Sequence, residues 1–309
     1  DVFRQCKKGY LILGGLLLIF AFVVLFKKKK WVTYTTWLLS LGILAVFVFH
    51  MYGMGMRWYI AGYAPWSNSY ETMVYVAWAT VFAGLLFVRK STLTFALATL
   101  FGGIILFVSG LSWMDPQINP LVPVLKSPWL MFHVAVIVGA YGFFGISCLI
   151  GLTNLVMMSV SGEKNSVMLK ERVRELSIVN EMSLWIGLAL MTIGTFLGAV
   201  WANESWGRYW GWDPKETWAL ITMIVYAVTT HLHFIPRLNT NPLVFDVMSV
   251  VGFSTVLMTF FGVNYYLSGL HSYGKSEGFS PEIVLAAGAG VLVLVAVAAV
   301  RYHKNKKTS

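Results

Sequence analysis

Tryptophan is concentrated in residues 201–218, called here the tryptophan segment. Five of the chain's 13 tryptophans fall in it, and Gly207 and Gly211 lie among them. Indole rings bind the faces of flat molecules, and glycine lets a ligand approach the backbone closely. The pattern indicates a site for a large planar ligand. The alternative is a membrane-interface belt, which accounts for one or two tryptophans better than for all five. The tryptophans are Trp201, Trp206, Trp210, Trp212 and Trp218.

The end of this segment carries the signals of a helix start. Asp213 is suited to the N-cap, Pro214 to the first helical position and Glu216 to the partner position of a capping box. The positive end of the helix dipole would then face the tryptophan segment.

Two of the six histidines are placed to bind a metal-containing planar ligand. His133 follows the helix start Ser127-Pro128 and therefore lies in the second helical turn, and His271 follows an apolar segment. We expect both on the membrane side that carries the tryptophans, where they could form an axial pair for haem iron. The alternative is that each is a surface histidine with a local hydrogen bond.

The other histidines lie elsewhere. His231 is 18 residues beyond Asp213, which places it about 27 Å away along a helix, so it cannot share a haem with the first two. His233 faces roughly the opposite side of that helix. His50 is expected to be a packed polar residue towards the outer leaflet, and His303 belongs to a basic tail.

The composition identifies an integral membrane protein, because 58% of the residues are apolar and 12% are charged. The net charge of +10 does not indicate nucleic-acid binding, since the basic residues gather at the ends of apolar segments. The two cysteines, Cys6 and Cys148, are too far apart in sequence to indicate a zinc site or a dithiol.

Nine apolar segments are each long enough to cross a bilayer as a helix. We predict an all-α, polytopic membrane protein with a single domain over residues 1–309. The charged connector 161–178 is predicted to be a short surface helix. The nine segments are about 9–26, 32–56, 71–88, 93–111, 128–158, 182–200, 216–234, 243–267 and 281–300.

The distribution of basic residues predicts the orientation. If the segments cross in turn, 15 of the 23 lysines and arginines, including those of the C-terminal tail, lie on one side. That side should be cytoplasmic, and the tryptophan segment should face outward. Arg4, Lys7 and Lys8 would then be exported, which a preceding exported domain would explain.

The tryptophan segment resembles the WWD signature of haem-handling membrane proteins. Its continuation Asp-Pro-Lys-Glu-Thr-Trp, residues 213–218, is similar to the CcsA (ResC) branch of System II cytochrome c biogenesis. Residues 64–71, 129–133 and 261–273 agree with that family, so the resemblance covers nearly the whole chain.

The resemblance implies a protein of a bacterial inner membrane that exports haem b and attaches it to CxxCH motifs of apocytochrome c. It implies that His133 and His271 are axial ligands of an outer haem, held by the tryptophan segment with Asp213, and that His231 ligates an inner haem. The second inner ligand would come from a partner, CcsB, and this chain looks like the CcsA half of a fused CcsB–CcsA protein. Arg57, Arg208 and Lys215 are candidate contacts for the haem propionates.

No side-chain nucleophile is expected, because the cysteines of the apocytochrome supply it. Three alternatives remain open: a haem transporter without lyase activity, a b-type membrane electron carrier and a structural partner that binds no haem. The electron carrier is disfavoured, because it would place paired histidines at both membrane depths.

Overall fold

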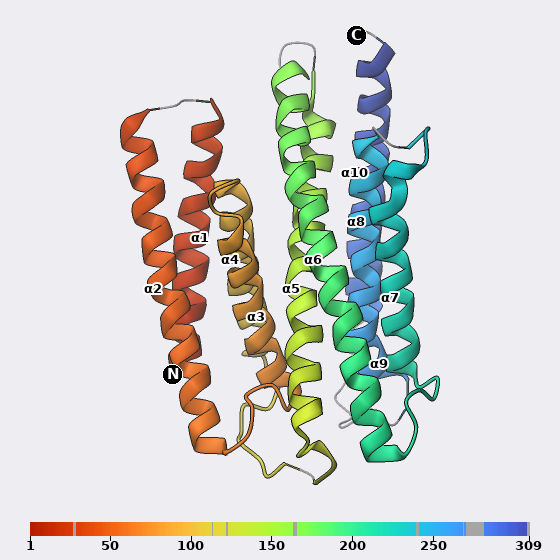
Figure 1. Ribbon diagram of the computed structural model, residues 1–309. Coiled ribbons are helices and arrows are strands. Elements are labelled where there is room, and N and C mark those ends of the chain that lie inside the picture. Colours follow the sequence, from red (N-terminus) through yellow and green to blue (C-terminus); the bar gives the residue numbers. More distant parts are fainter. Residues whose placement is uncertain are drawn as a thin grey trace. The chain divides into compact units, whose positions relative to one another are not determined.

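The computed structural model describes residues 1–26, 29–112, 114–121, 123–162, 166–238, 241–267, 269 and 281–307, and in these residues it is helical and has no strand (Figure 1). The α-helices are α1 (Val2–Phe26), α2 (Lys30–Ala61), α3 (Ser69–Leu86), α4 (Thr92–Ser109), α5 (Pro128–Val160), α6 (Ser166–Trp206), α7 (Pro214–His231), α8 (Pro242–Leu257), α9 (Val263–Tyr266) and α10 (Pro281–Lys307). Short 3-10 turns cover Pro123–Leu125 (η1) and Leu232–Phe234 (η2). A π-helical turn, η3, covers Met258–Gly262 and joins α8 to α9.

Eight of the described helical segments are long and apolar enough to span a membrane, and α8, η3 and α9 together form one of them. This confirms the all-α polytopic architecture. The ninth expected segment, 71–88, exists as α3 but is not among the eight. Its first turn carries the polar residues Ser69, Glu71 and Thr72.

The charged connector is not a separate surface helix. From Ser166 it forms the first turns of α6, which continues without interruption to Trp206 over 41 residues. No glycine or proline lies between residues 166 and 182, and the leucine, methionine, glutamate and arginine there favour helix. Arg172 and Glu175 add an ion pair one turn apart, at 2.6 Å.

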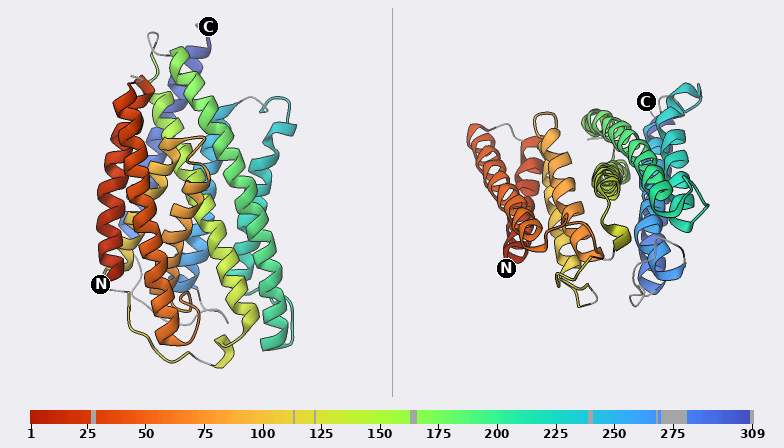
Figure 2. Two further views of the ribbon diagram at one scale, coloured as in Figure 1. Left: turned by 60° about the vertical axis from the view of Figure 1, so that its left-hand side comes forward. Right: turned by 60° about the horizontal axis from the view of Figure 1, so that its bottom comes forward.

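The chain divides into two compact units. Unit 1 contains residues 1–146 and 189–210, and unit 2 contains residues 147–188 and 211–309. In unit 1, α1 packs against α2 and α4, and α4 packs against α3 (Figures 1 and 2). The backbones of α1 and α4 approach closely, because a Cβ atom on Gly14 would lie 2.9 Å from the Leu100 nitrogen.

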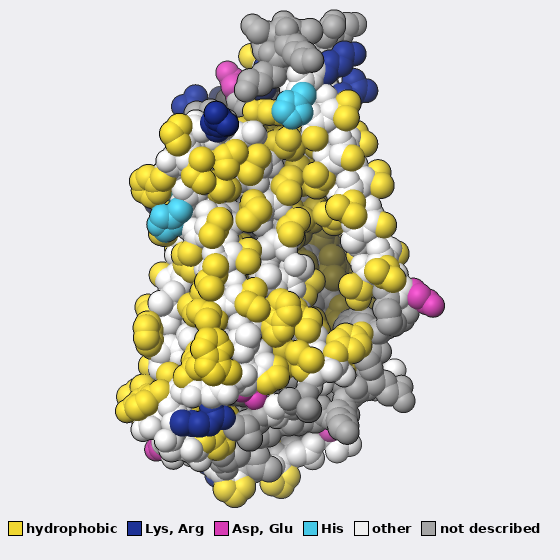
Figure 3. Space-filling view, turned by 90° about the vertical axis from the view of Figure 1, so that its right-hand side faces the viewer, with side chains coloured by type: hydrophobic (Ala, Val, Ile, Leu, Met, Phe, Trp, Pro, Cys, Tyr) yellow, Lys and Arg dark blue, Asp and Glu magenta, His cyan; other side chains and the backbone are white. Residues whose placement is uncertain are grey.

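In unit 2, α7 packs against α8 and the π-helical turn, and α10 packs against α8. Thr222 of α7 and Thr259 of the π-helical turn lie 3.3 Å apart through their hydroxyl oxygens. The face drawn in Figure 3 is mainly hydrophobic over most of its height, with lysine and arginine gathered towards its ends. This distribution fits a surface that contacts lipid.

Candidate functional site

His133 lies in the second turn of α5, as predicted, and its imidazole has a defined orientation. Its Nδ1 atom is 2.6 Å from the carbonyl oxygen of Gly194 on α6. A carbonyl oxygen only accepts hydrogen bonds, so Nδ1 must carry the proton. The Nε2 atom of the neutral ring therefore carries the lone pair, which is the form in which a histidine binds iron.

The ring of His133 fills the space beside a second glycine of α6. A Cβ atom on Gly198 would lie 2.6 Å from both Cε1 and Nδ1 of that ring. Gly194 and Gly198 are four residues apart and so lie on the same face of α6. Neither glycine was predicted to belong to the site, although their Gly-x-x-x-Gly spacing is a signal of close helix approach.

Two aromatic side chains hold the backbone of α5 on either side of His133. The indole nitrogen of Trp66 donates to the carbonyl of Met131 at 3.1 Å, and the hydroxyl of Tyr75 donates to the carbonyl of Ala135 at 3.0 Å. The rings of Trp66 and Tyr75 also touch, with centroids 4.8 Å apart. This positioning role was not predicted, although residues 64–71 carried part of the family resemblance.

Three tryptophans of the segment belong to unit 1. Trp201 is fully buried three residues beyond Gly198, and its ring lies 4.7 Å from that of Trp206 in an edge-to-face arrangement. The guanidinium of Arg208 lies over the Trp206 ring at 5.8 Å. Gly207 has φ of 72° and ends α6, with its N–H bonded to the Asn203 carbonyl. Gly207 therefore has a structural role as a helix cap. Trp210, the third of these tryptophans, is half-buried.

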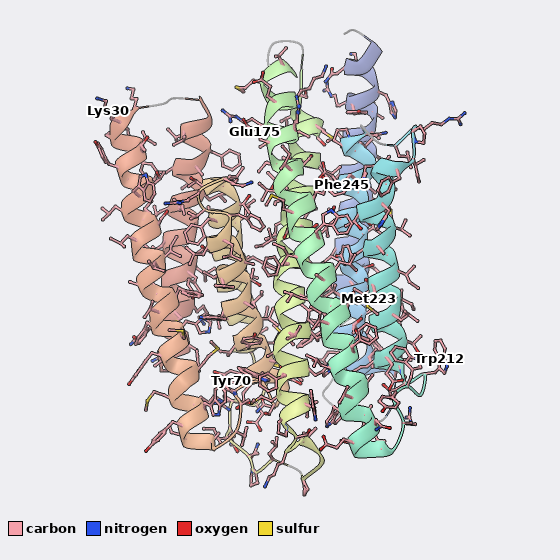
Figure 4. The ribbon with its side chains drawn as sticks, in the orientation of Figure 1. Lys30, Tyr70, Glu175, Trp212, Met223 and Phe245 are labelled. Carbon is pink, nitrogen blue, oxygen red and sulfur yellow. The ribbon has the colours of Figure 1, made fainter. Side chains whose placement is uncertain are left out.

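The part of the segment in unit 2 contains a residue with a strained backbone. Trp212 has φ of 58°, a left-handed conformation that is rare for large side chains, and 68% of the residue is exposed. Its ring points away from the α7 helix (Figure 4). Trp218, one turn into α7, is half-buried.

The predicted helix start is confirmed. Asp213 and Glu216 form a capping box with Pro214 in the first turn, and the Asp213 carboxylate accepts from the backbone nitrogen of Lys215 at 3.0 Å. The Glu216 carboxylate also accepts from the backbone nitrogen of Gly211 at 2.7 Å. Gly211 is therefore bound through its N–H to the start of α7.

His271 lies outside the described residues. Gly269, which is described, lies against the start of α7, because a Cβ atom on it would collide with the carboxylate of Asp213. The chain two residues before His271 thus reaches the helix start at the end of the tryptophan segment.

His231 is the last residue of α7, at the opposite end from Asp213, as its position in the sequence predicted. Its Nδ1 atom lies 2.7 Å from the Ala227 carbonyl oxygen, so Nδ1 carries the proton and Nε2 the lone pair. The ring is exposed and lies edge-on to Trp185 at 5.5 Å. The neighbour of His233 is Glu181 of α6, with 3.9 Å between the His233 Nδ1 and Glu181 Oε1 atoms.

Arg57 is engaged by acceptors of the protein. Its Nε atom pairs with the fully buried Glu71 at 2.6 Å, and its terminal nitrogens donate to the carbonyls of Pro116 and Gln117. Tyr63, beside this pair, has a raised pKa, mainly because of burial, with Glu71 adding to the effect and Arg57 opposing it. Arg57, in the last turns of α2, therefore ties that helix to the first turn of α3 and to the loop after α4.

His50 is fully buried, and its Nδ1 atom lies 3.2 Å from the Tyr10 hydroxyl. This agrees with the expectation of a packed polar residue.

Comparison with known proteins gives a consistent set of relatives. The family model for "Cytochrome C assembly protein" matches residues 66–271. Protein NrfI of Wolinella succinogenes is 42% identical over 284 residues, which cover 90% of this chain and 30% of NrfI. The cytochrome c biogenesis protein CcsA of Guillardia theta is 35% identical over 246 residues, covering 72% of this chain and 80% of that protein.

A solved structure shares the fold. Cytochrome c Heme Lyase CcmF matches with a TM-score of 0.59 at 14% identity, over 98% of this chain and 51% of CcmF. This chain thus spans less than a third of NrfI and about half of CcmF.

Proposed function

The chain belongs to the cytochrome C assembly protein family, and we propose that it delivers haem b to the outer face of the membrane and attaches it covalently to apocytochrome c. Haem is then a substrate in transit, and the protein is a cytochrome c haem lyase. The relatives named CcsA are cytochrome c biogenesis proteins by name, which supports the general role.

The orientation of His133 is the observation that carries the proposal. The Gly194 carbonyl fixes the proton on Nδ1, and Gly198 leaves room for the ring on α6. A carbonyl that holds the second ring nitrogen in this way is the usual support of a metal-binding histidine. In the proposal, Nε2 of His133 and the imidazole of His271 bind the iron of the outer haem.

His231 is proposed to ligate a second haem near the inner membrane face. Its Nδ1 is fixed by the Ala227 carbonyl, so it has the same tautomer as His133. Its exposed ring fits a ligand whose second histidine comes from another protein. By the family resemblance, that protein is CcsB, as a subunit or as a preceding part of a longer polypeptide.

The tryptophan segment is proposed to hold the outer haem. Trp206 and Trp210 would supply indole surface in unit 1, and the buried Trp201 would support the Trp206 ring. Trp212, Asp213 and Trp218 are the residues of unit 2 assigned to the same role. Arg208 is proposed to pair with a propionate. Lys215 remains a second candidate contact for a haem propionate. Arg57 is left out, because Glu71 and two backbone carbonyls already bind its guanidinium.

The reaction itself is the addition of a thiol to a vinyl group. The S–H bond of a substrate cysteine breaks, a C–S bond forms at one vinyl carbon and the hydrogen goes to the other, so no electrons are gained or lost overall. The protein contributes by holding the haem in place while both thiols of the CxxCH motif approach, which raises their effective concentration. A histidine of the motif can then replace a protein ligand of the iron.

We further propose that the tryptophan segment faces outward and the C-terminal tail faces the cytoplasm. Basic residues of the connectors support this orientation.

Absorption spectra of the purified protein with its CcsB part test the haem sites. Wild type should give a bis-histidine spectrum, and His133→Ala, His271→Ala and His231→Ala should each change it. A wild-type protein that carries no haem under any condition would contradict the proposal.

Co-expression with a c-type apocytochrome reporter, in cells without other attachment machinery, tests the lyase activity. Holocytochrome should form with the wild type and not with His133→Ala. Haem bound at both sites without holocytochrome would support a transporter without lyase activity.

A further inference from the structure

A cluster of polar side chains lies within the membrane-spanning helices of unit 2, and the proposed function gives it no role. Five of its six members are buried, and Ser177 is half-buried. Polar groups in such segments are costly unless they are hydrogen-bonded, and an ionisable one calls for an explanation. The Asp246 cluster consists of Ser147 and Asn154 of α5, Ser177 and Asn180 of α6, and Asp246 and Ser249 of α8.

The amide groups of the cluster use all their hydrogens. Nδ2 of Asn154 and Nδ2 of Asn180 each donate to Oδ1 of Asp246 at 3.1 Å. The second hydrogen of Asn180 goes to Ser249 at 3.2 Å, and that of Asn154 goes to Ser177 at 3.4 Å. An amide carries two hydrogens, so neither asparagine has another to give.

Two buried oxygens are left without a donor. These are Oδ2 of Asp246 and Oδ1 of Asn154. The Ser147 hydroxyl is already donated to Asn180 at 2.5 Å, and the Ser249 hydroxyl to the Phe245 carbonyl at 2.9 Å. Among the described residues, no lysine, arginine or histidine forms an ion pair with Asp246. An ionised carboxylate here would be both uncompensated and half unsatisfied.

We propose that Asp246 is a proton-binding site within the membrane. The proton is held on Oδ2 and is donated towards Oδ1 of Asn154. This single hydrogen gives both oxygens a hydrogen bond, with Oδ2 as the donor and Oδ1 of Asn154 as the acceptor. The acid and the amide then exchange two hydrogen bonds, one in each direction. The proton also makes the contact between α5, α6 and α8 electrically neutral, which a membrane interior requires.

Infrared spectroscopy of the full-length protein in detergent at neutral pH tests this assignment. A protonated carboxyl group has a carbonyl band apart from the bands of carboxylates. We expect this band in wild type and its loss in Asp246→Asn. The variant should still fold, because the new amide supplies an N–H that replaces the acid O–H towards Asn154. Asp115→Asn is the matched control, since Asp115 is an exposed loop residue, and it should leave the acid band in place.

A second variant tests the acceptor. Asn154→Leu removes the oxygen that receives the proton, so the acid band should persist at a higher frequency. A wild-type protein without an acid band, or a band that survives in Asp246→Asn, would overturn the proposal. So would a thermal midpoint that depends on sodium in wild type and not in Asp246→Asn, because the bound species would then be a metal cation.

Discussion

Replacing Gly198 with alanine places a methyl group where the imidazole of His133 now lies. The new Cβ atom would be 2.6 Å from Cε1 and Nδ1 of the ring and 3.2 Å from Nε2. Non-bonded heavy atoms settle about 3.5–4.0 Å apart, so the ring must withdraw by about 1 Å. The 2.6 Å hydrogen bond to the Gly194 carbonyl then stretches to about 3.6 Å and is lost.

The loss of this support should weaken iron binding at the outer site. Removing the partner of a metal-bound histidine typically reduces metal affinity by about 10- to 100-fold. We expect a decrease of that size in haem affinity for Gly198→Ala, because the ring loses both its fixed tautomer and its position.

Haem titration of the purified protein in a His231→Ala background measures the effect, since only the outer site then contributes. Gly139→Ala is the matched control. It introduces the same methyl group on α5, six residues after His133, where no atom lies within 4 Å of the new Cβ. Both changes improve helix propensity by about 1 kcal/mol, so a difference between them reports on the ring. Equal haem affinity and identical spectra for the two variants would refute the role given to Gly198.

Three further predictions concern the loops and the start of α7. Arg57→Ala leaves the buried Glu71 carboxylate without its ion-pair partner and should lower the free energy of unfolding by about 3–5 kcal/mol. The thermal midpoint in detergent should fall accordingly. An unchanged midpoint would mean that the ion pair does not stabilise the fold. Asp213→Ala removes the helix cap, at a cost of about 1 kcal/mol, so amide hydrogen exchange in the first turn of α7 should speed up while the last turn is unaffected. Trp212→Gly relieves a left-handed backbone that costs about 1–2 kcal/mol. That variant should unfold at a higher temperature and yet retain less haem, and full haem retention would remove Trp212 from the proposed site.

Local features of the fold were predictable because their partners are close in sequence. The two partners of the capping box, Asp213 and Glu216, are only three positions apart, and the sequence predicted it directly. A second capping box, between Asn68 and Glu71 at the start of α3, is only half present. The Asn68 side chain accepts from the Glu71 nitrogen, but the Glu71 carboxylate binds the nitrogen of Ser67 and the guanidinium of Arg57. The pairing with Arg57 depends on the fold of a loop, which no local pattern specifies.

Long-range features could not be predicted in the same way. The carbonyl that binds His133 belongs to Gly194, 61 residues away, and the contact exists only once α5 and α6 cross. The length of α6 was misjudged for a different reason. Charged residues predicted a surface segment, whereas the continuous helix depends on the absence of any glycine or proline there. The candidate histidines were proposed from residue type and depth, whereas the tautomers of His133 and His231 required coordinates.

The carbonyl that holds Nδ1 of His133 has a kinetic consequence. In the proposed outer site, the ring proton would sit on the nitrogen away from the iron, so binding and release at Nε2 would require neither deprotonation nor rotation of the ring. Exchange of the His133 imidazole for another ligand would then require little change beyond breaking the iron–nitrogen bond. Such a histidine suits transient haem binding, in which it is readily displaced from the iron by an incoming imidazole, better than permanent haem binding.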